Sequence, residues 1–283
     1  MRLLDGRPER LATIPYQAAG PGGGTQHVQL PVDRLYVDAL PAGCRALIAT
    51  GDLQGVAASP FGGAPGLLGI AFADYLTVWA DGGLLPPPDE VGVLLTGDLY
   101  SAPAADVRGA SGAVADVWLA FAAAGCRVVL GVAGNHDEVT KAQVAELGPD
   151  LALLDGDRRA YGGRTFAGVG GVIGDPGRPM RRTEKDFLTL VKKVAAAPTD
   201  VLLLHEGPAG TTPDQLGNAA VRGLLERRAP ALTLCGHVHW DHPAARLGDG
   251  HVINVDARAV VLTAGATTGA PGPGRPSSGA AGH

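Results

Sequence analysis

The stretch Gly134-Asn135-His136-Asp137 follows directly on the apolar run 128–132. A short, continuous apolar run of this kind suits a strand that is buried on both faces, as in a sheet flanked by helices. Side chains that come just after such a strand lie at the carboxyl edge of the sheet, where α/β proteins bind their ligands. The stretch therefore predicts an α/β fold with amide, imidazole and carboxylate groups gathered at that edge.

The same arrangement occurs at other places in the chain. Apolar runs at 46–49, 91–95, 201–204 and 231–234 end respectively at Gly51-Asp52-Leu53-Gln54, Gly97-Asp98, His205 and Gly236-His237-Val238-His239. Because the ends of neighbouring strands meet at one edge of a sheet, these segments can converge although they are far apart along the chain. Together they supply a plausible ligand set for two metal ions, and a metal-dependent hydrolase is the leading interpretation.

The order of these motifs resembles the calcineurin-like metallophosphoesterase superfamily. The pairing of Gly134-Asn135-His136-Asp137 with the later Gly236-His237-Val238-His239 is a specific signal, and the resemblance spans residues 45–266. It implies a four-layer α/β/β/α sandwich built from two mixed sheets. It also implies hydrolysis of a phosphoester by a hydroxide that two divalent metal ions activate.

The resemblance further implies a role for each motif residue. One ion takes Asp52, Gln54, Asp98 and His239, and the other takes Asp98, Asn135, His205 and His237. Such a mixture of nitrogen and oxygen ligands suits Mn, Fe or Zn better than Mg or Ca. His136 is the proton donor or transition-state stabiliser, and Asp137 orients it by a hydrogen bond to its other ring nitrogen.

The first motif departs from the family pattern. The family usually has Asp-x-His there, whereas this chain has Asp52-Leu53-Gln54. The Gln54 amide offers a carbonyl oxygen, but it is neutral and a weaker donor than imidazole for most transition metals. Three interpretations stay open: Gln54 binds its ion weakly, it holds a water so that the site works with one ion, or the enzyme is decayed.

Taken singly, the candidate ligands have structural alternatives. Asp52 and Asp98 each follow a glycine and are typical of turns, and His205 alone is typical of a hydrogen-bonded core histidine. His237 and His239 point to the same face if their segment is extended, which favours joint ligation. The set as a whole favours the metal site.

Four further residues are candidates for substrate binding. Tyr100 lies just past Asp98 and either lines the pocket or only packs. Arg178, Arg181 and Arg182 form the basic cluster of the chain. Arginine binds phosphate through two parallel hydrogen bonds, so the cluster either contacts a substrate phosphate at the rim or is a solvated helix start.

Composition limits the class of protein. The chain has 283 residues, of which 46% are hydrophobic and 18% charged, enough for one domain with a sizeable core. Its net charge of −5 gives no long-range attraction for nucleic acid or an anionic membrane, although a nucleotide can still bind at a local metal site. Three cysteines without a Cys-x-x-Cys pair argue against a disulfide framework.

The chain also shows no apolar run long enough to span a membrane, and its first residues break before a signal peptide could form. We therefore expect a soluble protein in the cytoplasm. Its oligomeric state stays open.

The chain divides into three parts by composition. Residues 1–44 are a Gly-rich N-terminal extension or an edge hairpin, with short strands at 27–30 and 35–37, that covers the core or acts as a flap over the site. Residues 45–266 form the metallophosphoesterase domain. Residues 267–283 lack the side chains to bury a core and are predicted to be disordered.

Within the domain the spacing of apolar residues predicts the following elements. Helices are expected at 67–80, 109–124, 141–147, 183–197 and 217–228, a hairpin at 160–173, and two final antiparallel strands at 251–255 and 259–263.

The leading functional hypothesis is hydrolysis of a small phosphomonoester or phosphodiester, with a nucleotide among the candidate substrates. The alternatives are a protein phosphatase and a non-catalytic binding protein that keeps the fold. The second motif reads Gly97-Asp98-Leu99-Tyr100-Ser101. It lacks the continuation Val-Asp-Arg-Gly of the Ser/Thr phosphatases, which counts against the first alternative.

Overall fold

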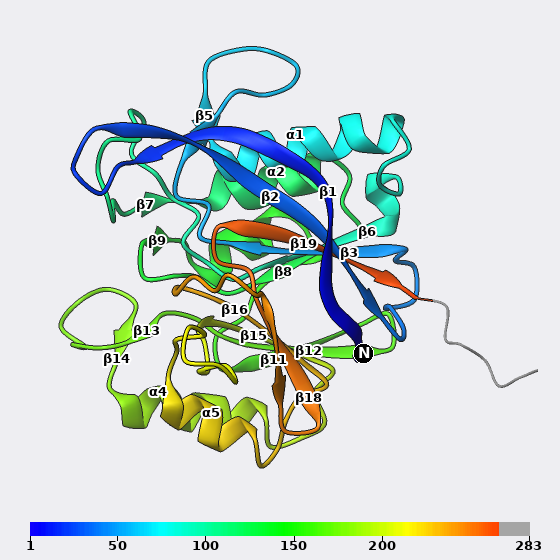
Figure 1. Ribbon diagram of the computed structural model, residues 1–283, viewed down its shortest axis with the longest axis vertical. Coiled ribbons are helices and arrows are strands. Elements are labelled where there is room, and N and C mark those ends of the chain that lie inside the picture. The colour runs from blue at the N-terminus through cyan, green and yellow to red at the C-terminus, as the bar shows by residue number, and fades with distance from the viewer. Residues whose placement is uncertain (266–283) are drawn as a thin grey trace, which may run out of the picture.

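Two β-sheets packed face to face, with helices on both outer sides, make up the protein (Figure 1). The computed structural model describes residues 1–265. In the described part the helices are α1 (Leu68–Asp81), α2 (Ala115–Ala123), α3 (Lys141–Leu147), α4 (Glu184–Val194) and α5 (Ala219–Leu225), with a 3-10 turn η1 at Pro88–Glu90. The predicted four-layer α/β/β/α architecture is confirmed.

The larger sheet has nine strands. In spatial order they are β10 (Leu151–Leu153), β8 (Val128–Gly131), β6 (Val91–Leu95), β3 (Ala46–Gly51), β19 (Arg258–Ala264), β2 (Thr25–Val37), β1 (Leu3–Ala19), β4 (Val56–Ala57) and β5 (Gly66–Leu67). Strands β10, β8, β6 and β3 are parallel to one another, whereas β19 is antiparallel to β3.

The smaller sheet has six strands. In spatial order they are β11 (Asp157–Tyr161), β12 (Arg164–Val169), β15 (Val201–Glu206), β16 (Leu232–Gly236), β18 (Gly250–Asn254) and β17 (Ala244–Leu247). Two short pairs lie outside both sheets: β13 (Val172–Ile173) with β14 (Arg181–Arg182), and β7 (Gly112–Ala113) with β9 (Asp137–Glu138). The predicted hairpin at 160–173 is present as β11 and β12.

The layers follow from side chains that alternate along buried strands. In β3, Ile48 belongs to the apolar cluster under helices α1 and α2, whereas Leu47 and Ala49 belong to the cluster between the two sheets. A third cluster joins α4 and α5 to the outer face of the smaller sheet. Since both faces of the central strands are buried, these strands read as continuous apolar runs rather than as alternating ones.

Helix starts follow local capping chemistry. The Thr183 hydroxyl accepts a hydrogen bond from the Asp186 backbone N–H at the start of α4, and Asn218 caps α5 in the same way through Val221. At α3, Thr140 and Gln143 form a reciprocal capping box. These caps satisfy N–H groups that have no partner within the helix. No helix among residues 1–265 is both long and apolar enough to cross a membrane.

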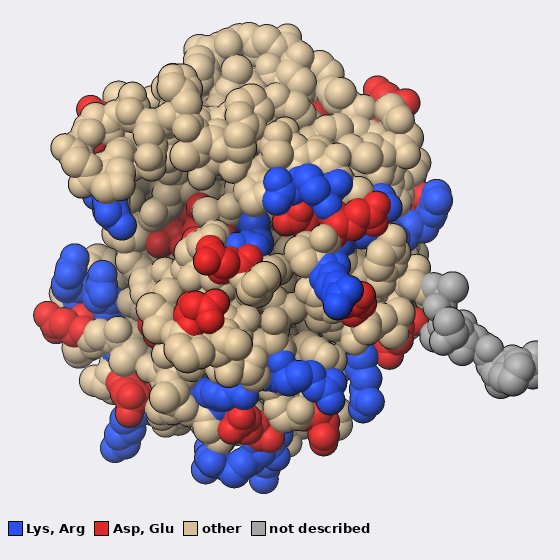
Figure 2. All heavy atoms as spheres, in the orientation of Figure 1, with Lys and Arg blue, Asp and Glu red and all other residues tan. Residues whose placement is uncertain are grey.

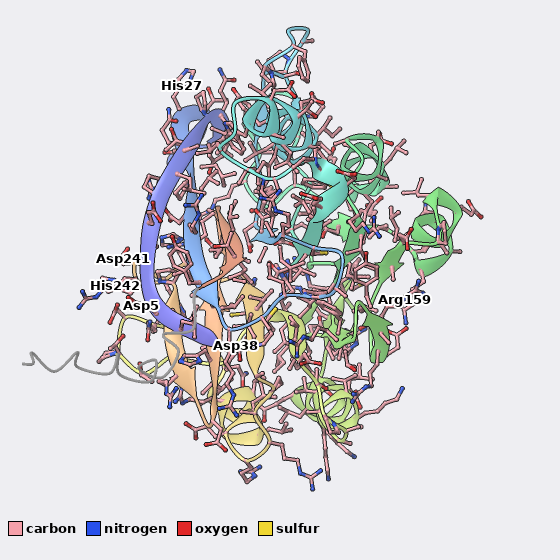
Figure 3. All side chains as sticks on the ribbon, turned by 90° about the vertical axis from the view of Figure 1, so that its right-hand side faces the viewer. Asp5, His27, Asp38, Arg159, Asp241 and His242 are labelled. Atoms are coloured by element: carbon pink, nitrogen blue, oxygen red, sulfur yellow. The ribbon has the colours of Figure 1, made fainter. Side chains whose placement is uncertain are left out.

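The N-terminal residues form a long antiparallel hairpin that is continuous with the larger sheet. Strand β2 pairs with β19 on one side and with β1 on the other. The prediction of two short strands was wrong: they are one strand of 13 residues, and β1 was missed because most of its side chains are exposed. In Figure 3 the hairpin forms one side of the molecule, with His27 near its turn and Asp38 toward its base.

Two other expectations differ from the structure. The last two predicted strands exist, but β18 lies in the smaller sheet and β19 in the larger, so they are not a pair. The helix predicted at 109–124 begins only at Ala115, because the preceding residues form β7 and pass over the site. The predicted disorder at 267–283 concerns residues outside the described part of the chain.

Candidate metal centre and active site

The motif residues sit on sharp turns at the carboxyl ends of their strands. Asp52 follows β3, Asp98 lies beyond β6, and His237 follows β16. All three have positive φ angles, of 52°, 53° and 70° respectively. Side chains other than glycine seldom adopt this left-handed conformation, and it recurs where a binding site fixes a side chain in place.

Motif glycines allow these turns to approach one another. A Cβ atom on Gly134 would lie 2.0 Å from Oδ1 of Asp98, and one on Gly236 would lie 2.1 Å from Oδ2 of Asp52. Neither contact is sterically possible. The glycines of the two motifs therefore make room for the carboxylates that the other motifs supply.

Asp98 lies at the centre of the site. Its Oδ1 atom accepts a hydrogen bond of 2.9 Å from the His136 backbone N–H. Its Oδ2 atom lies 3.4 Å from Nε2 of His205 and 3.2 Å from Nε2 of Gln54. Ligand atoms of Asp98, His205 and His237 all fall within 4.8 Å of one another, a spacing that suits a metal ion.

Two buried polar atoms beside Asp98 point to the same conclusion. Nε2 of His205 and Oδ1 of Asn135 are buried without a hydrogen-bond partner. Nδ1 of His205 donates to the Thr96 carbonyl oxygen at 2.8 Å, so Nε2 is the ring nitrogen that faces Oδ2 of Asp98, at 3.4 Å. Because buried polar atoms are rarely left unpaired, Asp98, Asn135, His205 and His237 fit a divalent ion with mixed nitrogen and oxygen ligands.

The electrostatics of the site favour a cation. Burial opposes a charged imidazole at His205, but the carboxylates of Asp98 and Asp52 outweigh it and raise the pKa of His205 to about 10. Burial and the charge of His205 lower the pKa of His237 to about 4. Burial and repulsion by Asp256 raise the pKa of Asp52 well above its usual value. Closely spaced buried carboxylates of this kind need a positive charge among them.

His136 and Asp137 are both at the site, but not in the predicted relation. Nδ1 of His136 lies 3.1 Å from Oγ of Ser111, and its ring reaches toward the pocket. The Asp137 carboxylate instead accepts backbone N–H bonds from Gly134, Asp98 and Leu99 at 2.7–2.8 Å. Asp137 therefore does not orient the His136 ring. It ties two motif loops together, and burial raises its pKa to about 6.

His239 is also placed differently from the expectation. His237 and Val238 form a bend, so the segment is not extended as expected, and His239 lies outside the cluster of ligand atoms although it lines the same pocket. His237 joins the cluster with Asp98 and His205. The His239 ring lies instead between Asp256 and Arg258, at 3.2 Å from each side chain.

A pocket of about 670 Å³ opens over these residues. Figure 2 shows a hollow between the upper and lower parts of the molecule, with acidic side chains inside it. Its lining comes from the motif loops, the N-terminal hairpin and the loop before β7; it includes Asp52, Gln54, Asp98, His136, His237 and His239, together with Tyr16, Gln26, Tyr100, Arg108 and Asp256. Tyr100 thus lines the pocket, as one of the two interpretations held.

The predicted arginines do not line this pocket. Arg182 pairs with Asp155 and donates to the Gly170 carbonyl oxygen, while Arg181 is the first residue of the short strand β14 and Arg178 precedes it. Arg108 was not predicted, because it belongs to no motif. Asp256 was not predicted either, although it comes just after the strand β18, as the recognised motifs come just after theirs.

Fold and site together define a class, that of metal-dependent hydrolases with ligands at the carboxyl edge of a two-sheet sandwich. A family model described as calcineurin-like phosphoesterase matches residues 46–241. The chain belongs to this family, whose members are metal-dependent phosphoesterases.

Solved structures agree on the fold. The crystal structure of the protein TT1561 from Thermus thermophilus is 18% identical, with a TM-score of 0.50 over 76% of this chain and 90% of that one. A second crystal structure is 13% identical, with a TM-score of 0.51 over 77% of this chain and 91% of that one. No curated protein resembles the chain closely enough to count as a match.

Proposed function

We propose that the protein hydrolyses a small phosphomonoester or phosphodiester, with a nucleotide among the candidate substrates. The observation that carries the proposal is the cluster of Asp98, His205 and His237, with buried atoms on His205 and Asn135 that lack a hydrogen bond, beside a pocket that Asp98 and His237 line. Mn, Fe or Zn suits these ligands. A bound ion of this type acidifies a water and neutralises charge on phosphoryl oxygens.

The surrounding residues have distinct tasks. The His136 ring, held by Ser111, lies in the pocket where it can donate a proton to a leaving oxygen or stabilise its charge. Arg108 is the cationic residue among the lining side chains and can hold a phosphate oxygen. Tyr16 and Tyr100 offer aromatic rings against which a planar group such as a nucleobase can pack.

The size of the site favours a small substrate over a protein. Hairpin residues, including Tyr16 and Gln26, line the pocket, and Asp98 is 3% exposed, so a folded protein surface has little access to it. The resemblance implied two ions. Support is strongest for the ion at Asp98, Asn135, His205 and His237, because Gln54 and His239 have other partners.

The test is a substrate panel in the presence of Mn²⁺: p-nitrophenyl phosphate, bis-p-nitrophenyl phosphate, cyclic nucleotides and dinucleoside polyphosphates. We expect turnover of at least one small ester and its loss in Asp98→Asn, which removes the central negative ligand. Turnover that is equal in this variant and the natural protein would contradict the site. Binding of a phosphoester without hydrolysis would favour the non-catalytic alternative.

We also propose a reducing, cytoplasmic setting. Supporting it, Cys44, Cys126 and Cys235 are all free thiols.

A further inference from the structure

His239 uses both of its ring nitrogens in contacts with other side chains. Nδ1 lies 3.2 Å from Oδ1 of Asp256 and 3.3 Å from the Asp256 carbonyl oxygen. Nε2 lies 3.2 Å from Nη2 of Arg258. A guanidinium can only donate, so Nε2 accepts, and the ring proton therefore sits on Nδ1 and points at Asp256. A neutral imidazole in this position has no lone pair left for a metal ion.

Arg258 is held firmly in this arrangement. It is the first residue of β19, where it pairs with Gly51 of β3, and it is buried. Its Nη2 atom also donates to the Trp240 carbonyl oxygen. An ion on Nε2 of His239 would have to displace a buried guanidinium and place two positive charges side by side. Such a rearrangement is costly because a buried charge needs its partners.

The remaining ligands expected for the same ion are also engaged. Nε2 of Gln54 donates to Oδ2 of Asp98 at 3.2 Å, so the amide turns an N–H group toward the central carboxylate on this side. Oδ2 of Asp52 accepts from the His237 backbone N–H at 2.9 Å. The other end of the site differs, because Oδ1 of Asn135 has no hydrogen-bond partner there and Nε2 of His205 only faces Oδ2 of Asp98 at 3.4 Å.

We propose that the protein holds one divalent ion tightly, at Asp98, Asn135, His205 and His237, and that the second ion is replaced by protein groups. Those groups are the Gln54 amide and the hydrogen-bonded chain Asp256–His239–Arg258. In this hydrogen-bonded chain the imidazole lies between a carboxylate and a guanidinium, so both ring nitrogens of His239 have partners without an ion. The proposal rests on the proposed function, since it concerns the same site.

The first test compares the two histidines of one motif. Metal-free protein is titrated with Mn²⁺ by calorimetry, and bound metal is counted by mass spectrometry after dialysis. We expect one tight ion per chain. We expect His237→Ala to weaken it by at least about 10-fold, the loss seen even when only an indirect partner of a metal is removed. His239→Ala should change its affinity by less than about 2-fold. Two equally tight ions, or equal losses in both variants, would overturn the proposal.

The second test tries to restore the missing ion. Gln54→His alone should leave the count at one, because His239 remains tied to Arg258. Gln54→His combined with Arg258→Gln should raise it to two, since Gln can still donate to the Trp240 carbonyl oxygen but brings no charge. A second tight ion in the single variant, or a folded double variant with one ion, would overturn the role given to Arg258. If the double variant does not fold, the comparison of His237→Ala with His239→Ala still tests the proposal.

Measured activity distinguishes a failure of this inference from a failure of the proposed function. A natural protein that hydrolyses esters with two tight ions would refute the inference and leave the function standing. One tight ion without hydrolysis of any ester in the panel would contradict the proposed function and leave the inference standing.

Discussion

At the scale of single residues, the backbone and the side chain of His136 have separate tasks. Its backbone N–H donates to Oδ1 of Asp98, whereas its ring faces the pocket and contacts Ser111. A substitution can therefore remove the ring and keep the support that the backbone gives to the metal site.

We expect His136→Ala to lower kcat by about 10²–10⁴, the usual contribution of a positioned acid or charge stabiliser. Metal content should not change, since alanine keeps the N–H bond to Asp98. The loss should be smaller for p-nitrophenyl esters than for alkyl esters, because p-nitrophenol leaves without a proton. Ser111→Ala is the control and should have a milder effect. Equal losses for good and poor leaving groups would argue for charge stabilisation rather than proton donation.

At the scale of elements, glycines decide whether strand ends can meet. The loop after β8 passes so close to the loop after β6 that Gly134 has no room for a side chain, because a Cβ there would lie 2.0 Å from Oδ1 and 2.3 Å from the backbone N of Asp98. Asp137 fastens the same two loops through three backbone N–H groups. These contacts position Asp98 before any ion binds.

We expect Gly134→Ala to weaken metal binding and to abolish most of the activity, because the new methyl group must push Asp98 away. Gly223→Ala is the matched control. Gly223 lies within α5, and a Cβ there meets nothing within 4 Å. That variant should keep full activity and gain up to about 1 kcal/mol of helix stability. Metal titration and thermal unfolding of both variants check this pair, and normal metal affinity in Gly134→Ala would refute the steric argument.

At the scale of the whole molecule, the pocket is assembled from parts that no single element contains. Both sheets contribute candidate ligands, since Asp98 follows β6 of the larger sheet and His205 lies in β15 of the smaller. The N-terminal hairpin adds Tyr16 and Gln26 to the wall. Substrate and metal binding therefore depend on how the sheets pack together.

The hairpin gives one prediction about substrate affinity. We expect Tyr16→Ala to raise KM by about 2–10-fold with little change in kcat, since an aromatic contact is worth about 0.5–1.5 kcal/mol and is made equally in ground and transition states. His27→Ala, on the same hairpin but outside the lining, should leave both constants unchanged. Steady-state kinetics check this, and a fall confined to kcat would instead place Tyr16 at the reacting groups.

Joining the two sheets through an ion should also stabilise the whole fold. An ion that binds only the folded state at 100 times its Kd adds about 2.7 kcal/mol, which corresponds to a rise in Tm of roughly 5–10 °C. We expect removal of metal by a chelator to lower Tm by about that amount and Mn²⁺ to restore it. His237→Ala should abolish the shift. A Tm that does not respond to metal would mean that the cluster around Asp98 holds no ion.

The order of the motifs was sufficient to predict the family, and the apolar runs were sufficient to predict the layers. Continuous apolar runs are local signals of buried strands, and residues at their ends must lie at one edge of the sheet. Asp98, His205 and His237 were therefore expected together, and their ligand atoms lie within 4.8 Å of one another. The helix α3 and the hairpin of β11 and β12 were also predicted, because caps, turns and periodicity are encoded locally.

Which ring nitrogens and carboxylate oxygens remain free depends instead on tertiary packing. Arg258 reaches His239 because the chain passes from β18 of the smaller sheet to β19, which inserts between β3 and β2 of the larger sheet. Asp137 was assigned to the His136 ring, but its carboxylate is used by backbone N–H groups that fold back onto it. Partners of this kind come from strand order and from the direction of a turn, which depend on the packing of distant segments and leave no local pattern in the chain.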